Sequence, residues 1–286
     1  MRQIQTQGLV FSCFAVLISL TSILMGPMDL FSTLLLVSPM ILILGVPHGA
    51  LDPVFAKHLF SIDTWRTWAK FTLLYAILSL SVIVTWWIFP LSFMAGFLML
   101  SALHFSRDLT RSTLKLTRIL YGGAIIILPT LLHSDQVTEL FALMLNQEMG
   151  RQIVTFLKVL AWPWLIISTG AICIELRKNW RTGLEFGSVC LLTVLVQPLV
   201  AFAVFFCAMH SCRHIMRTHF YSELSFKKLL LISLAPMVGT ILLATAGWLY
   251  LPSSPDYPRI VQFLFVMLAA LTLPHMLLIE RIEFAH

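Results

Sequence analysis

Two histidines, His210 and His214, lie four residues apart at the end of the apolar segment 201–214. On an α-helix this spacing places both imidazoles on one face, about 6 Å apart along the axis. That separation lets two rings bind one metal ion, as in other H-x-x-x-H sites on helices. The competing interpretation is a pair of histidines at a membrane interface, and the spacing alone does not separate the two.

His48 and His104 also lie near the C-terminal end of an apolar run, and each is followed four residues later by an aspartate, Asp52 or Asp108. Ionisable groups inside membrane spans are costly and often functional. We expect Asp52 to accept the outer N–H of His48, and Asp108 that of His104, which would orient each ring as a metal ligand. The alternative is that the aspartates are the first solvated residues after a helix end. That suits Asp108 better, because arginines flank it.

His275 follows Pro274 near the end of the last apolar run, so its setting resembles that of His48 after Pro47. It is a candidate metal ligand, a group that orients a ligand, or a residue on the substrate side. The remaining histidines are expected on the surface, in loops or at the terminus: His58, His133, His219 and His286.

Neutral imidazoles without a thiolate or carboxylate ligand suit iron(II), zinc or copper. Iron(II) would permit dioxygen chemistry, and the apolar surroundings would select a lipid-soluble substrate. The 21 phenylalanines and 13 methionines would then line a cavity for a long apolar molecule. The simpler interpretation is that these phenylalanines and methionines pack helices or face lipid.

The five cysteines form no C-x-x-C motif, so they predict neither a disulfide framework nor a thiolate zinc site.

The segments that carry these residues are apolar enough to lie in a membrane. The chain is 59% hydrophobic and 11% charged, with a mean hydropathy of +0.91, whereas soluble domains carry roughly 25% charged residues. Several runs are roughly 20 residues long with almost no charge, enough to cross a bilayer as a helix. The sequence predicts an all-α, polytopic transmembrane helix bundle of about eight or nine spans, in one integral membrane domain over residues 1–286.

The first apolar run lacks a small-residue cleavage signature and is interpreted as a retained helix. Pro47 and Gly49 bracket His48 and are expected to kink or break the second span.

The net charge of +6 is spread over short loops, so it indicates membrane topology rather than nucleic-acid binding. The expected spans cover residues 8–25, 30–51, 70–89, 90–106, 152–176, 184–208, 227–251 and 260–279, with a shorter run at 119–132 and an amphipathic connection at 133–151.

These spans leave a conflict about sidedness. If every run crosses once, the segment around His210 emerges opposite to His48 and His104. The basic residues after it, including Arg213 and Arg217, argue for the same cytoplasmic side as the basic cluster 107–118. Either run 119–132 does not cross fully, or the histidines lie deeper than the loop ends.

Four short motifs follow one another along the chain: Pro47-His48-Gly49-Ala50-Leu51-Asp52, His104-Phe105 with Asp108, His210-Ser211-x-Arg213-His214, and Leu273-Pro274-His275. Taken in this order, they resemble the motifs of the Brp/Blh family of membrane-bound β-carotene 15,15'-dioxygenases, and the resemblance covers nearly the whole chain. The chain departs from the family at two places: position 53 is Pro where many members continue with His, and Ser106-Arg107 replaces a commonly smaller, glycine-containing turn.

The resemblance implies oxidative cleavage of the central double bond of β-carotene by O₂, giving two molecules of all-trans-retinal, with iron(II), Fe²⁺, as cofactor. It places the iron ligands on His48, His104, His210 and His214, and leaves Asp52, Asp108 and His275 as orienting groups or alternative ligands. The expected setting is a multi-pass protein of a prokaryotic inner membrane, in contact with lipid and functionally linked to a retinal-binding opsin.

Two other classes of protein stay open. A membrane desaturase or hydroxylase would need more histidine clusters than the one H-x-x-x-H found here. A non-catalytic carotenoid- or opsin-associated membrane protein would keep an apolar cavity but tolerate loss of the histidines.

Overall fold

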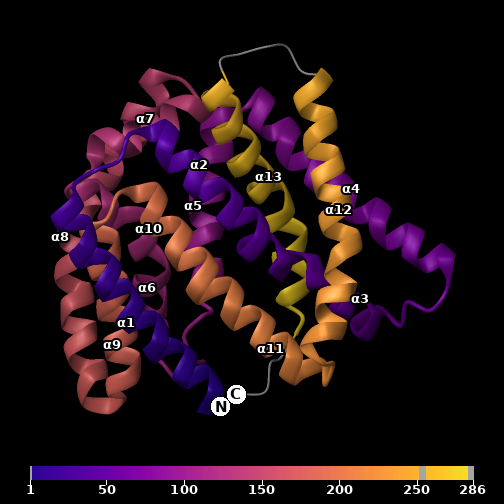
Figure 1. Cartoon of the computed structure of the whole chain (residues 1–286), viewed down its shortest axis with the longest axis horizontal. Coiled ribbons are helices and arrows are strands. Elements are labelled where there is room, and N and C mark those ends of the chain that lie inside the picture. Colours follow the sequence, from indigo (N-terminus) through magenta and orange to yellow (C-terminus); the bar gives the residue numbers. More distant parts are fainter. Residues whose placement is uncertain (1, 251–255, 283–286) are drawn as a thin grey trace.

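The computed structural model describes residues 2–250 and 256–282, and these residues are almost entirely helical, with no strand among them. The predicted all-α bundle is confirmed (Figure 1). His286 lies outside the described residues. In chain order the elements are α1 (Arg2–Met25), α2 (Leu30–Met40), η1 (Ile41–Gly45), η2 (Val46–Leu51), α3 (Asp52–Phe60), α4 (Trp65–Ile88), α5 (Pro90–Phe105), α6 (Lys115–Ile127), η3 (Leu128–Leu131), α7 (Ser134–Met144), α8 (Gln147–Lys178), α9 (Trp180–Leu195), α10 (Pro198–Val204), η4 (Phe205–Ser211), α11 (Cys212–Ser222), α12 (Phe226–Tyr250) and α13 (Asp256–Ile279).

Seven helices in the described part of the chain are long and apolar enough to cross a bilayer. An eighth span is present if the bent pair Lys115–Leu131 and Ser134–Met144, which meet at 108°, counts as one. The expected total of about eight or nine is reached when this pair and the shorter apolar helix α5 are included. α4 buries none of its residues, as suits a helix that faces lipid. The chain is therefore a multi-pass membrane protein.

The predicted span 184–208 is wrong, because this region forms two helices that run in opposite directions. α9 ends at Leu195, Val196 is extended, and Pro198 opens α10, where its fixed φ and missing N–H suit the first helical turn. The Gln197 side chain holds the turn by pairing with the backbone of Met28, with its amide nitrogen 2.7 Å from the carbonyl oxygen. This extra reversal brings the His210 segment back to the end of the bundle where His48 and His104 lie, and the sidedness conflict disappears.

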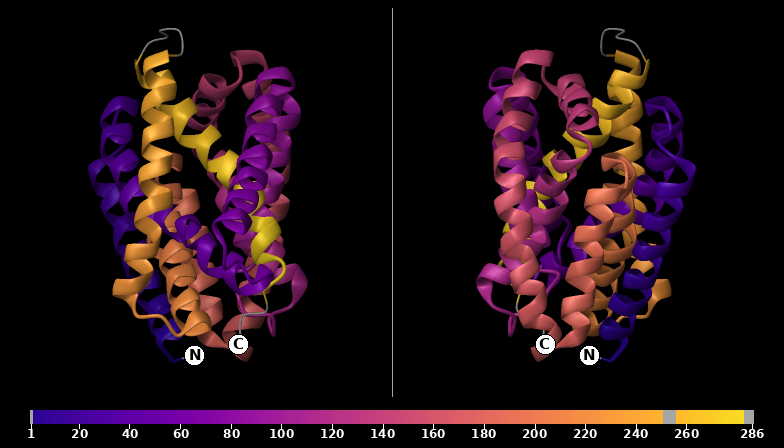
Figure 2. Two further views of the ribbon diagram at one scale, coloured as in Figure 1. Left: turned by 90° about the vertical axis from the view of Figure 1, so that its right-hand side faces the viewer. Right: turned by 90° about the vertical axis from the view of Figure 1, so that its left-hand side faces the viewer.

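α1 begins and α13 ends at the same end of the bundle (Figure 2). Four arginines line one cavity with Ile279 and Glu280 at the end of α13, so we call this the basic end: Arg107, Arg111, Arg118 and Arg217. Contacts between distant segments fix this end: Arg107 pairs with Glu280 after α13, and Arg181 of α9 donates to Gln5 of α1. The positive-inside rule predicts that this end faces the cytoplasm.

The two segments that carry His48 and His210 depart from regular α-helix. After α2 the chain passes through the π-helical turn η1 into the 3₁₀ turn η2, as the Pro47-His48-Gly49 sequence predicts. η4, which contains His210, is also π-helical. The two π-helical segments pack closely, because a Cβ on Gly45 would clash with Cε1 of the Phe206 ring. Such widened turns occur often at functional sites, where they re-aim a side chain.

Candidate metal centre

Five histidines from five separate elements meet inside the basic half of the bundle. They come from η2, α5, η4, α11 and α13, and each is buried. From the His48 ring centroid, the other four centroids lie 5.0 to 6.4 Å away. The cluster consists of the four histidines that the family resemblance implies as ligands and of His275: His48, His104, His210, His214 and His275.

Ring nitrogens in this cluster are buried without a hydrogen-bond partner among the described residues. They are Nδ1 of His104, Nε2 of His210 and Nε2 of His275. Burying an unpaired polar atom is costly, so such atoms in one cluster call for a bound group that they contact. One ligand nitrogen each from His48, His104 and His275 lies within 4.8 Å of the others. This donor set fits a metal ion that accepts imidazole ligands.

His48 is oriented by backbone and hydroxyl groups rather than by an aspartate. Its Nδ1 lies 2.5 Å from the carbonyl oxygen of Gly45 and 3.0 Å from Oγ of Ser211. The Ser211 hydroxyl itself donates to the Gly45 carbonyl at 3.1 Å. With Nδ1–H engaged in this way, Nε2 of His48 carries the lone pair that a metal would use.

The expected pairing of Asp52 with His48 is wrong, because Asp52 contacts His275. Oδ1 of Asp52 lies 2.6 Å from Nδ1 of His275, and Oδ2 accepts a hydrogen bond of 2.9 Å from the Tyr75 hydroxyl. The i, i+4 rule failed because it assumes a continuous α-helix. Here the chain between His48 and Asp52 is a tighter 3₁₀ turn, which rotates residue i+4 to another face.

The expected pairing of Asp108 with His104 is also wrong, and the partner is His210. Both carboxylate oxygens of Asp108 lie 3.1 Å from Nδ1 of His210. α5 ends at Phe105, and the following turn aims Asp108 across the bundle at η4. Asp52–His275 and Asp108–His210 are thus two equivalent carboxylate–histidine pairs, an arrangement that fixes the tautomer of histidines that bind metals.

A buried arginine supports the turn that carries Asp108. Arg213, between the two histidines of the H-x-x-x-H pair, donates to both carboxylate oxygens of Glu185 at 2.7 and 2.8 Å. It also donates to the side-chain oxygen of Gln7 and, at 3.0 Å, to the backbone carbonyl of Asp108. Sequence reasoning missed Gln7 and Glu185. The signal for Glu185 was its position as an acidic residue in an apolar run.

The other described histidines do not join the cluster. His58 is exposed near Tyr221, and His133 is half-buried at the turn between η3 and α7. His219 is half-buried, with Nδ1 2.6 Å from the carbonyl oxygen of Leu224. All three lie near the ends of helices, outside the proposed ligand set.

A family model described as "Beta-carotene 15,15'-dioxygenase" matches residues 39–283 of the chain. A "Beta-carotene 15,15'-dioxygenase" of an uncultured marine bacterium, 66A03, is 29% identical over 260 residues, which cover 86% of this chain and 93% of the relative. A "Probable beta-carotene 15,15'-dioxygenase Blh" of Halobacterium salinarum is 24% identical over 316 residues, covering 96% of this chain and 91% of the relative. No solved structure matches the chain.

Proposed function

Because the chain belongs to the beta-carotene 15,15'-dioxygenase family, we propose that it cleaves β-carotene at its central 15,15' double bond with O₂. The carbon–carbon double bond breaks, and each of its two carbons takes one oxygen atom. The products are two molecules of all-trans-retinal, and no external reductant is needed. The observation that carries this proposal is the cluster of five buried imidazoles inside a bundle of membrane-spanning helices.

The proposed cofactor is iron(II), which neutral imidazoles can bind without a thiolate or carboxylate. Its proposed ligands are His48, His104, His210 and His214, and His275 is the candidate for a fifth. Buried Nε2 atoms without partners, on His210 and His275, support this assignment. Bound in this site, iron(II) would supply the redox chemistry that links O₂ to the polyene.

The protein's own task is to hold the imidazoles still. Asp108 and Asp52 accept from the Nδ1 atoms of their histidines and so keep Nε2 available toward the centre of the cluster. Ser211 does the same for His48. Fixing the donors before a ligand arrives lowers the reorganisation needed during the reaction.

An aromatic row beside the cluster is the proposed contact surface for the polyene. The Phe206 ring stacks on His210 at 5.8 Å between centroids and meets His48 edge-on at 5.2 Å. Phe202 stacks on Phe206 at 5.4 Å, and Phe265 of α13 follows at 5.6 Å. Flat, apolar rings of this kind suit a conjugated hydrocarbon chain and exclude water from the bond that reacts.

The proposed setting is the inner membrane of a prokaryotic cell, with the basic end of the bundle in the cytoplasm. The substrate, dissolved in lipid, would then enter between helices without crossing water. A retinal-binding opsin in the same membrane is the proposed consumer of the product.

Expression in cells that make β-carotene tests the proposed reaction. Chromatography should detect all-trans-retinal and a matching loss of β-carotene with the parent protein and with His58→Ala. His210→Ala should give none, although the variant still inserts. Unchanged β-carotene with correctly inserted parent protein, or equal retinal from His210→Ala, would overturn the proposal.

A further inference from the structure

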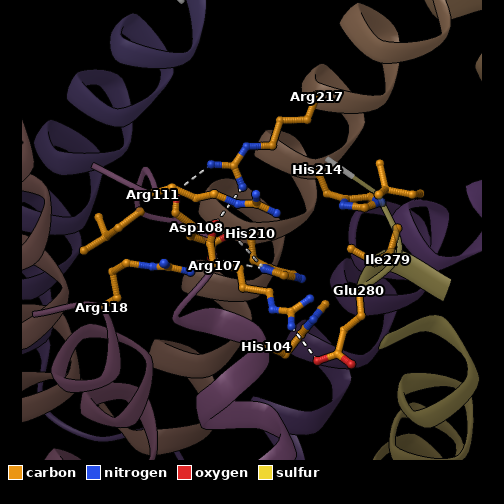
Figure 3. A pocket seen from close by; sticks show the side chains of 12 residues that line it. His104, Arg107, Asp108, Arg111, Arg118, His210, His214, Arg217, Ile279 and Glu280 are labelled. Carbon is orange, nitrogen blue, oxygen red and sulfur yellow. Dashed lines mark hydrogen bonds and ion pairs between the residues drawn. The ribbon is translucent and has the colours of Figure 1, made fainter. Parts of the chain in front are cut away.

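A cavity of about 150 Å³ lies between the histidine cluster and the basic end of the bundle (Figure 3). Its inner wall is formed by His104, His210 and His214. Its rim reaches water, since the side chains of Arg107 and Glu280 there are 35% and 51% exposed. The cavity therefore connects the proposed metal site with the aqueous side of the membrane.

Arginines dominate the outer part of this cavity, which we name the arginine vestibule. Four of them line it, Arg107, Arg111, Arg118 and Arg217, against two carboxylates. Both carboxylates are already engaged: Asp108 holds His210, and Glu280 holds Arg107 at 2.5 Å. Among the described residues that line the vestibule, arginines outnumber carboxylates by two.

Two of these guanidinium groups are held in place by neutral backbone oxygens. Arg217 donates to the carbonyls of Arg107 and Asp108, each at 2.8 Å. Arg118 donates through Nε to the carbonyl of Ser106 at 3.3 Å, and in Figure 3 its guanidinium extends toward Asp108 and His210. Carbonyl oxygens fix the position of a guanidinium without neutralising its charge, so both groups are preorganised for an anion.

Positive-inside bias alone accounts for basic residues at this end of the bundle, but it predicts side chains spread into solvent. Arg118 and Arg217 are instead only partly exposed and face a shared cavity. Positive charge collected in a partly buried space is stabilised by an anion that brings several acceptor oxygens. The cavity has room for several waters, or for a small oxyanion with some of them.

We infer that the arginine vestibule binds a phosphate group on the water-facing side of the histidine cluster. The group is either inorganic phosphate or the phosphodiester of a lipid headgroup, since both present the same tetrahedral oxygens. It bridges the α5–α6 turn, which carries Asp108, and α11, which carries Arg217 and directly follows the η4 segment of His210. Binding therefore stabilises the part of the fold that brings Asp108 and His210 together. The inference does not depend on the proposed carotenoid reaction.

The test uses the purified full chain in a neutral detergent and measures thermal unfolding and heats of binding. Inorganic phosphate is titrated at constant ionic strength against chloride. Phosphatidylglycerol in mixed micelles is compared with diacylglycerol, which lacks the phosphate. Arg118→Gln removes one vestibule guanidinium, and Arg111→Gln removes another at the exposed rim, where loss of packing is small. Arg66→Gln, on the exposed start of α4, is the matched control.

Saturable stabilisation of the parent and Arg66→Gln by inorganic phosphate, weakened about tenfold or more in the vestibule variants, supports a site for free phosphate. The same pattern with phosphatidylglycerol alone supports a headgroup site. If Arg118→Gln does not fold, the Arg111→Gln titration decides. Equal responses in the vestibule variants and in the control, or no response to either probe, overturn the inference.

Discussion

Replacing Asp108 with asparagine removes the carboxylate that orients His210 while nearly keeping its shape. In the parent both carboxylate oxygens lie 3.1 Å from Nδ1 of His210, and Asp108 is 3% exposed. Asparagine retains one acceptor oxygen but presents an NH₂ group at the other position and carries no charge. Loss of such an orienting carboxylate typically lowers metal affinity about 10- to 100-fold, which corresponds to about 1.4–2.7 kcal/mol.

The assay is an anaerobic iron(II) titration of purified Asp108→Asn beside the parent, with thermal unfolding as a check that the variant is folded. Asp135→Asn at the start of α7, far from the cluster, is a matched control and should bind iron like the parent. We expect weaker iron binding and a proportional loss of retinal formation for Asp108→Asn. A folded Asp108→Asn with parental iron affinity would refute the idea that this carboxylate prepares His210 as a ligand.

Three further predictions test the site. Asp52→Asn should weaken iron binding about as much as Asp108→Asn if His275 is a fifth ligand, and parental affinity in the titration would exclude His275. Gly45→Ala should lower the free energy of unfolding by about 1–3 kcal/mol because its Cβ would meet a phenylalanine ring, whereas Gly49→Ala meets nothing within 4 Å. Equal denaturation curves for the two alanine variants would contradict this. Glu185→Gln should cost about 3–5 kcal/mol by leaving the buried Arg213 without its counter-ion, and Glu148→Gln on the surface should cost far less. Similar losses in the two glutamine variants would contradict a structural role for the pair.

The features that were predicted correctly from the sequence are those that depend on composition and on local residue patterns. Long uncharged runs are sufficient for membrane helices, and the H-x-x-x-H spacing put His210 and His214 near each other. The break at Pro47-His48 followed from proline geometry. Each of these features is determined by residues that are neighbours in the chain.

The wrong predictions concern contacts between distant segments or local geometry that is not α-helical. Asp52 and Asp108 were each paired with the nearest histidine along the chain, but their partners are 223 and 102 residues away. The turn at Val196–Gln197 lies inside an apolar run that looks continuous in the sequence. A proline such as Pro198 can open a new helix as well as break one, so the run alone does not predict a turn there. The role of Gln7 depends on α1 lying beside α11, which no local pattern encodes.

The most direct test of the central claim is the iron content of purified protein, measured by elemental analysis in parallel with its activity. The account predicts about one iron per chain in the parent and in His58→Ala. It predicts loss of both iron and retinal formation in each single alanine variant of His48, His104, His210 and His214, because residues that hold one metal act as a unit. Stoichiometric zinc without iron in an active parent, or full iron and activity in any of these four variants, would contradict it.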